Sequence, residues 1–188
     1  MVVVPQRRGR GGSGGRYLEG WSAEARRYSC DPATALTSLD RAMEDLSEVV
    51  RHLLARPEVD SRRLLVGGHS KGGLLALTFA ARQPALFIGA INFVGGWVGE
   101  RCETAGDVNG SAFTRAARFS GPSLWLYGER DPYYDIAHSR RNFDKFRAAG
   151  GQGEFHVLRM ASQRHDHQIV HGRAEWQDHM SMFLAPLR

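Results

Sequence analysis

The sequence predicts a parallel α/β fold in a single domain, residues 1–188, with the sheet flanked by helices. Short apolar runs typical of buried strands alternate along the chain with longer stretches of helical periodicity. Hydrophobic residues make up 42% and charged residues 24% of the chain, which is ordinary for a globular protein. No apolar run is long enough to cross a membrane, so no membrane partner is expected.

The predicted elements follow in chain order and show no internal repeat. Strands are predicted at residues 2–4, 64–67, 88–94, 123–127 and 155–158. Helices are predicted at residues 40–56, 74–82, 136–149 and 174–184. Between them, residues 97–120 are expected to form a small cap or an irregular loop.

The first predicted strand is a β-branched run that Pro5 ends. The glycine–arginine stretch at residues 7–15 resembles a nucleic-acid-binding segment, but it is short and lies between structured regions, so a loop is favoured. The net charge of +5 comes largely from scattered arginines, which favours solubility over nucleic-acid binding. The amino-terminal charge order is the reverse of a secretory signal and favours the cytoplasm.

Helical periodicity is clear in the first predicted helix, where apolar residues recur every three or four positions. Ser38 or Asp40 is the expected cap at its start, and Pro57 ends it. The last predicted helix carries Trp176 and Phe183 on one face. Such faces are expected to cover the sheet.

A strand, a sharp turn and a helix meet at Gly68-x-Ser70-x-Gly72. Both glycines are expected to remove Cβ atoms that would collide where strand and helix meet. A serine becomes a useful nucleophile when such a turn aims its hydroxyl at a histidine base. The alternative is a glycine-rich turn with a solvent-exposed serine.

Acidic residues follow the strand predicted at residues 123–127. Sites in parallel sheets form beyond the carboxyl ends of strands. Asp131 is therefore the first candidate for the acid that orients a histidine, with Asp135 second and Glu129 third. The alternative is that Asp131 only begins a turn before Pro132.

Three histidines, His165, His167 and His171, follow the strand predicted at residues 155–158. A histidine in this loop completes the chain order serine, acid, histidine that α/β-hydrolases use. A metal site is disfavoured because no cysteine or consistent carboxylate accompanies the histidines. No metal or organic cofactor is expected.

These motifs give the chain a resemblance to the α/β-hydrolase superfamily, within it to the dienelactone-hydrolase and prolyl-oligopeptidase-like group. Residues 3–13 resemble that group's fourth strand and the Arg-Gly-x-Gly-x-Ser loop after it. Residues 59–63 resemble the lead-in to the nucleophile strand, and residues 126–131 the segment that carries the acid. Asp166-His167 resembles the segment that carries the base, with its glycine absent.

The resemblance covers nearly the whole chain and implies a role for four residues. Ser70 is the nucleophile, Asp131 the acid and His167 the base. The backbone N–H of Lys71 is one oxyanion donor.

One departure from the group concerns the front of the sheet. Its members have three further strands before the one at residues 2–4, and the loop after the third supplies a second oxyanion donor. In the group's arrangement a gap one strand wide would separate residues 2–4 from residues 64–67. Direct pairing of these two strands, a second chain in the gap, or a truncated start would resolve this. A truncated sheet in a fragment is favoured, and self-association through the incomplete sheet is a further expectation.

The chain has two cysteines, Cys30 and Cys102. Two cysteines do not make a disulfide framework, although they could pair in an oxidising compartment. Free thiols are therefore the expected state.

Taken together, these features predict a serine hydrolase that cleaves a small carboxylic ester or a lactone through an acyl-enzyme. The alternative from another class is a hydrolase-fold remnant without catalysis that serves as a binding or interaction module. Nucleic-acid binding through residues 7–15 is the least favoured hypothesis.

Overall fold

The computed structural model describes residues 1–24, 26–161 and 164–187. Within them, four parallel strands form one sheet in the order β3-β4-β5-β6, with bounds Leu64–His69, Phe87–Phe93, Pro122–Gly128 and Gln152–Leu158. Two short strands, β1 (Trp21–Ser22) and β2 (Arg27–Tyr28), form a separate antiparallel pair. The predicted parallel α/β fold is confirmed.

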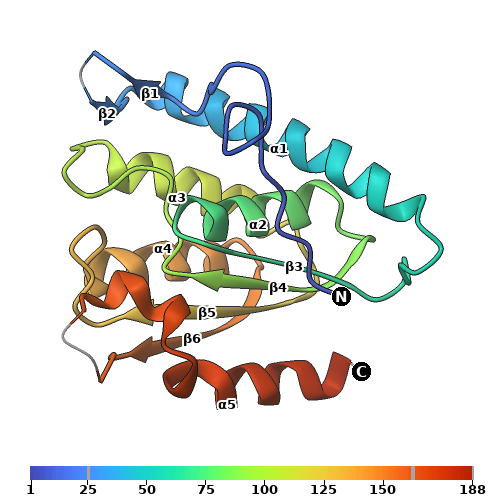
Figure 1. Ribbon diagram of the computed structural model, residues 1–188. Coiled ribbons are helices and arrows are strands. Elements are labelled where there is room, and N and C mark those ends of the chain that lie inside the picture. The colour runs from blue at the N-terminus through green and yellow to red at the C-terminus, as the bar shows by residue number, and fades with distance from the viewer. Residues whose placement is uncertain (25, 162–163, 188) are drawn as a thin grey trace.

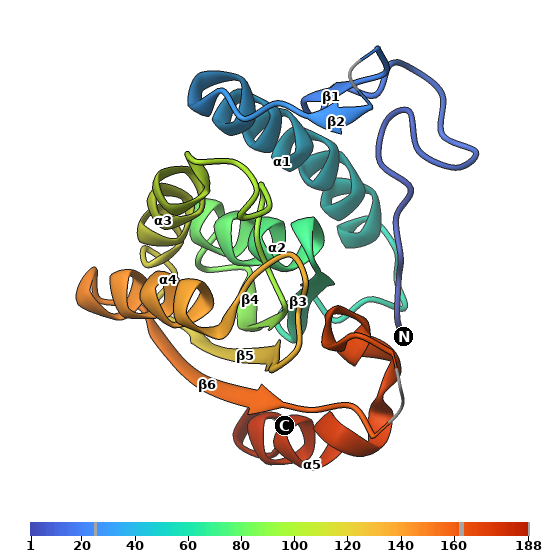
Figure 2. The same cartoon turned by 90° about the vertical axis from the view of Figure 1, so that its left-hand side faces the viewer.

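Helices cover both faces of this sheet (Figures 1 and 2). Helices α2, α3 and α4 lie on one face, with bounds Lys71–Arg82, Ala105–Ala116 and Ile136–Ala148. Helix α5 (Arg173–Leu184) lies on the other face, and α1 (Pro32–Leu54) packs outside α2 and α3. Two short 3₁₀ helices, η1 (Asp166–His171) and η2 (Ala185–Leu187), flank α5.

Strand β6 has side chains that contact helices on both faces of the sheet. Its Phe155 faces α4, where the guanidinium of Arg140 lies 4.3 Å from the ring centre. The next residue, His156, packs on His179 of α5 with ring centres 4.0 Å apart. Successive side chains of a strand point to opposite faces, so the sheet is covered on both sides.

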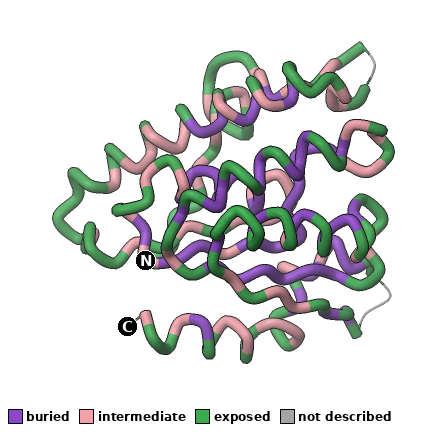
Figure 3. Tube along the Cα trace, turned by 180° about the vertical axis from the view of Figure 1, so that it is seen from behind, coloured by how far each residue is buried: buried purple, intermediate pink, exposed green. Residues whose placement is uncertain are grey.

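The core lies between the sheet and the α2–α3–α4 layer, and Figure 3 shows buried residues concentrated there. Trp125 of β5 is fully buried, and its ring contacts Phe113 of α3 and Phe146 of α4. Burying large aromatic rings in this way contributes a large part of the hydrophobic stabilisation of a domain. The strands predicted at residues 64–67, 88–94, 123–127 and 155–158 all lie in this sheet.

Helix α1 begins earlier than predicted. Its cap is Asp31, whose side chain accepts a hydrogen bond of 2.7 Å from the backbone N–H of Thr34, and Pro32 follows as the first helical residue. The prediction of a cap at Ser38 or Asp40 is wrong. Ser38 is buried within the helix and its hydroxyl donates to the carbonyl of Ala35.

Of the two alternatives for residues 97–120, a small cap or an irregular loop, the irregular loop is wrong, because α3 lies there. Its buried face is built partly from small residues such as Gly110, Ala112 and Ala116. These residues allow close packing but give only a weak hydrophobic periodicity. The helix was therefore not visible as an apolar pattern.

Residues 2–4 do not form a strand, so the prediction of one there is wrong, and they are not paired with β3. Val2 is 91% and Val4 85% exposed. Val3, Val4 and Pro5 instead line a largely apolar groove of about 290 Å³ together with β3 and α1. Among the described residues, no strand pairs with the outer edge of β3.

Candidate active site

Ser70 lies at the turn between β3 and α2, with φ of 56° and ψ of −124°. A positive φ is costly for a residue with a side chain, so the surroundings must hold it in place. The backbone N–H of Ser70 donates to the carbonyl of Phe93 in β4 at 2.9 Å, and its carbonyl accepts from Gly73 at 2.9 Å. The turn is thus fixed from both sides.

The two glycines of the motif have different roles. A Cβ on Gly68 would lie 2.2 Å from the carbonyl oxygen of Gly72, so no side chain fits at position 68. A Cβ on Gly72 would meet nothing within 4 Å, which corrects the expectation that both glycines relieve a collision. The third glycine, Gly73, is also required, because its Cβ would lie 2.3 Å from Oδ1 of Asn92.

Asp131 and His167 come from the loops after β5 and β6 and meet at the carboxyl end of the sheet. Nδ1 of His167 lies 2.8 Å from Oδ2 of Asp131, and the Asp131 side chain is fully buried. The other oxygen of Asp131 accepts from the backbone N–H groups of Tyr133 (2.8 Å) and Tyr134 (3.3 Å). A carboxylate held in this way can fix the tautomer of the histidine and stabilise its cation.

The other acidic candidates have structural roles. Asp135 caps α4, where its side chain accepts from the backbone N–H of His138 at 2.5 Å. Glu129 forms an exposed ion pair of 3.4 Å with Arg159.

Of the three candidate histidines, His167 is the buried one. His165 and His171 are exposed. The ring of His165 lies 6.4 Å from that of His167. In the part of the chain that the structure describes, no three side chains form a potential metal site.

An ion pair between the half-exposed Arg130 and the buried carboxylate of Asp166 joins the two loops that carry Asp131 and His167. Asp166 accepts from the backbone N–H of Arg130 (2.8 Å), from its guanidinium (2.9 and 3.1 Å) and from the backbone N–H of Met160 (3.1 Å). Burial would raise the pKa of Asp166, but these hydrogen bonds outweigh it and lower the pKa. Sequence reasoning missed this clamp because it noted Asp166 only as a neighbour of His167.

A pocket of about 470 Å³ opens beside Ser70 and His167. Tyr134 lines this pocket. Burial raises the pKa of the Tyr134 phenol, and a hydrogen bond with the Ser70 side chain opposes this effect in part. Tyr134 therefore stays protonated at neutral pH. The pocket is also lined by Lys71, Trp97 and Tyr28.

Lys71 directly follows Ser70, and its side chain reaches back to the amino-terminal segment. Its ammonium lies 3.8 Å from the ring centre of Tyr28 and 3.9 Å from that of Trp97, and it donates to the carbonyl of Glu19 at 3.1 Å. Burial lowers the pKa of Lys71 to about 7. Its backbone N–H belongs to the first turn of α2, where N–H groups have no intrahelical acceptor.

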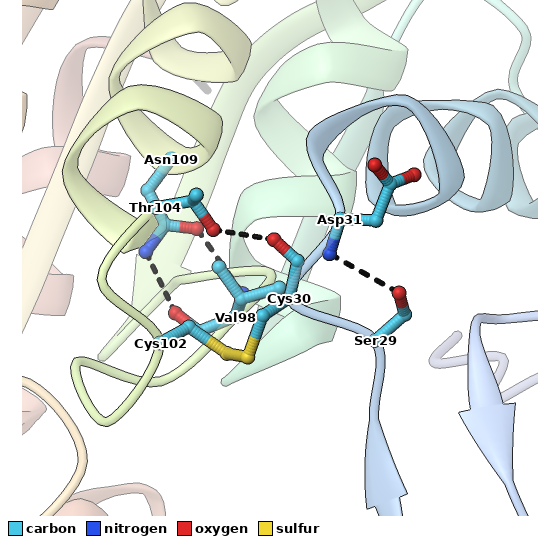
Figure 4. The surroundings of a disulfide bond; sticks show 7 residues. All are labelled: Ser29, Cys30, Asp31, Val98, Cys102, Thr104 and Asn109. Atoms are coloured by element: carbon cyan, nitrogen blue, oxygen red, sulfur yellow. Dashed lines mark hydrogen bonds between the residues drawn. A yellow bond between two sulfur atoms is a disulfide. The ribbon is translucent and has the colours of Figure 1, made fainter.

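A disulfide joins the amino-terminal segment to the loop after β4 (Figure 4). The Cys30–Cys102 bond spans 72 positions, and Thr104 donates to the carbonyl of Cys30 at 2.5 Å beside it. The two cysteines are bonded to each other, so the expectation of free thiols is wrong. The bond holds together two walls of the pocket, since Tyr28 and Trp97 lie close to it in the chain.

The comparisons with known proteins identify the family and the fold. The sequence profile of the phospholipase/carboxylesterase family matches residues 28–176, which is most of the chain. The chain belongs to the phospholipase/carboxylesterase family. This family is part of the α/β-hydrolase superfamily, so the superfamily expected from the sequence is confirmed. No curated protein sequence matches it significantly.

Several solved structures share the fold of this family member. An esterase from Pyrococcus furiosus has a TM-score of 0.67 at 16% identity, over 96% of this chain and 68% of that one. A candidate dienelactone hydrolase from Klebsiella pneumoniae has a TM-score of 0.57 at 22% identity, over 90% and 72%. A SOBER1 variant from Arabidopsis thaliana has a TM-score of 0.54 at 16% identity, over 79% of this chain but only 65% of that one. The chain therefore spans about two thirds of that relative.

Proposed function

We propose that this chain is a serine hydrolase that cleaves a carboxylic ester or a lactone through an acyl-enzyme. Ser70 is the nucleophile, His167 the general base and Asp131 the residue that orients His167. The observation that carries the proposal is the buried Asp131–His167 pair, 2.8 Å apart, whose His167 lines the same pocket as the strained Ser70 turn. Family membership supports the same class of reaction.

The chemistry follows from these positions. Asp131 binds Nδ1 of His167, which leaves Nε2 free of that contact to accept a proton. Ser70 Oγ attacks the carbonyl carbon while His167 takes its proton, and the backbone N–H of Lys71 stabilises the oxyanion. The intermediate collapses to an acyl-enzyme as His167 returns the proton to the leaving alcohol. A water molecule, activated by His167 in turn, then hydrolyses the acyl-enzyme.

A fluorophosphonate probe tests the proposal directly, because it forms a covalent bond only with an activated serine. We expect the wild-type chain to be labelled and to hydrolyse a p-nitrophenyl ester, and Ser70→Ala to do neither. Ser47→Ala on α1 is the matched control and should behave as the wild type, since Ser47 donates to the carbonyl of Met43 on its own helix and is not among the described residues that line the pocket. A folded wild-type chain that is not labelled would support the alternative, a hydrolase-fold binding module.

A further inference from the structure

The pocket beside Ser70 has a net positive charge among its described lining residues. Three cationic side chains line it, those of Arg7, Arg10 and Lys71, and no aspartate or glutamate is among its described lining residues. The cations come from two separate parts of the chain, the amino-terminal segment and the start of α2. A substrate in this pocket therefore meets positive charge on the side that the amino-terminal segment forms.

The buried carboxylate of Glu19 forms ion pairs with two of these cations and is not among the described residues that line the pocket. Arg7 lies 2.6 Å and Arg10 3.7 Å from the oxygens of Glu19, which is only 5% exposed. Lys71 donates to its backbone carbonyl instead of its carboxylate. The one carboxylate thus lies beside two arginines, so the cluster keeps an excess of positive charge even before Lys71 is counted.

Arg10 is the cation of this cluster that is best placed to meet a ligand. Its side chain is 46% exposed, against 19% for Arg7. Its guanidinium donates to the hydroxyl of Tyr28 at 3.1 Å, which holds it at the rim of the pocket. A guanidinium held in place by neighbours binds an oxyanion at a lower entropic cost than a free one.

The charge on Lys71 is sensitive to the groups around it. Burial is the main cause of its lowered pKa. The negative charge of Glu19 opposes this effect, and the positive charges of Arg7 and Arg10 lower the pKa further. An anion in the pocket would relieve this repulsion. Groups that disfavour one another's charge in this way favour a ligand of opposite sign.

We propose that this pocket selects esters that also carry an oxyanion, a carboxylate or a phosphate, and that Arg10, Arg7 and Lys71 receive it. This inference rests on the proposed function, because it places the anionic group in the pocket where Ser70 reacts. It goes further by assigning the amino-terminal segment a role in substrate selection. The hydrolysed bond remains a carboxylic ester.

The test compares two p-nitrophenyl esters of similar length, the anionic monoester of glutaric acid and the neutral valerate. We expect the wild type to favour the anionic ester in kcat/KM by about tenfold at low ionic strength, and less as salt is added. Arg10→Gln should reduce this ratio several-fold. Arg16→Gln is the matched control, because Arg16 lies on the same segment, is exposed and does not line this pocket. It should leave the ratio unchanged.

A binding measurement separates this inference from the proposed function. Calorimetry with Ser70→Ala protein should detect binding of glutarate or of glycerol 3-phosphate, and the tighter of the two identifies the oxyanion. Adding Arg10→Gln should weaken that binding about tenfold. The inference is overturned if the wild type hydrolyses the two esters with equal kcat/KM, even when Ser70 is reactive. It is also overturned if Arg10→Gln keeps both the wild-type preference and the wild-type affinity for the oxyanion. Oxyanion binding without hydrolysis overturns only the proposed function.

Discussion

Among single residues, Asp131 is the acidic side chain whose removal should affect chemistry most. Asp131→Asn removes the negative charge that stabilises the protonated His167, and an orienting aspartate can be worth about 10⁴ in rate. We expect a loss of that order in kcat for a p-nitrophenyl ester. Asp135→Asn is the control, because Asp135 caps α4 and should cost at most about 1 kcal/mol of stability with little change in rate. Near-normal turnover by Asp131→Asn would contradict the assignment.

A second prediction at this scale concerns the choice of histidine. His167→Ala should reduce turnover of the same ester to near background, because it removes the group proposed to accept the serine proton. His165→Ala and His171→Ala should retain most activity, since both residues are exposed and neither is among the described residues that line the pocket beside Ser70. Kinetics of the three variants decide the matter. The largest loss in His165→Ala would move the base two positions back.

Contacts between segments that are distant in the sequence hold the elements around the pocket together. The strongest of these contacts is the Cys30–Cys102 disulfide. Reduction, or Cys30→Ser with Cys102→Ser, should lower the free energy of unfolding by about 4 kcal/mol, because the bond closes a loop of 72 positions in the unfolded chain. That corresponds to a fall in Tm of about 10 °C. Calorimetry with and without a reductant measures it. An unchanged Tm, or two reactive thiols in the native protein, would contradict the bond.

The Arg130–Asp166 clamp makes stability depend on pH. The pKa of Asp166 is lowered in the folded state, so its ionised form stabilises the fold above the unfolded pKa of about 4, and this contribution is lost as the pH falls through the folded pKa. Asp166→Asn should therefore lower the urea midpoint at pH 7 but differ less from the wild type at pH 3. Glu129→Gln is the control, because its ion pair is exposed and should matter little. An equal difference at both pH values would argue against the clamp.

For the molecule as a whole, the open edge of β3 is the notable feature. Its backbone groups have no strand partner among the described residues, and an uncharged edge of this kind favours pairing with a second copy. We expect a mass that rises with concentration in sedimentation experiments. Leu65→Lys on β3 should suppress this association, whereas Val157→Lys on the opposite edge strand should not, although both residues are 40% exposed. A mass that stays monomeric across the concentration series would exclude it.

The sequence by itself determined the elements whose signals are local. The apolar runs of β3 to β6 and the periodicity of α2, α4 and α5 depend on neighbouring residues, so they could be located without a structure. The strand–turn–helix around Ser70 was visible for the same reason, since glycine at position 68 is a local steric requirement. Ser70, Asp131 and His167 could be selected as candidates because each follows a predicted strand in a set order.

Contacts between distant segments were decided only by the tertiary structure. The Cys30–Cys102 bond and the Glu19 cluster join residues that no local pattern relates. Whether residues 2–4 become a strand depends on a partner strand for their backbone, and no described strand pairs with them. Asp131, Asp135 and Glu129 all follow the same predicted strand, and the paths of two loops bring Asp131 to His167. Such choices depend on the energy of packing between elements, which a local pattern does not contain.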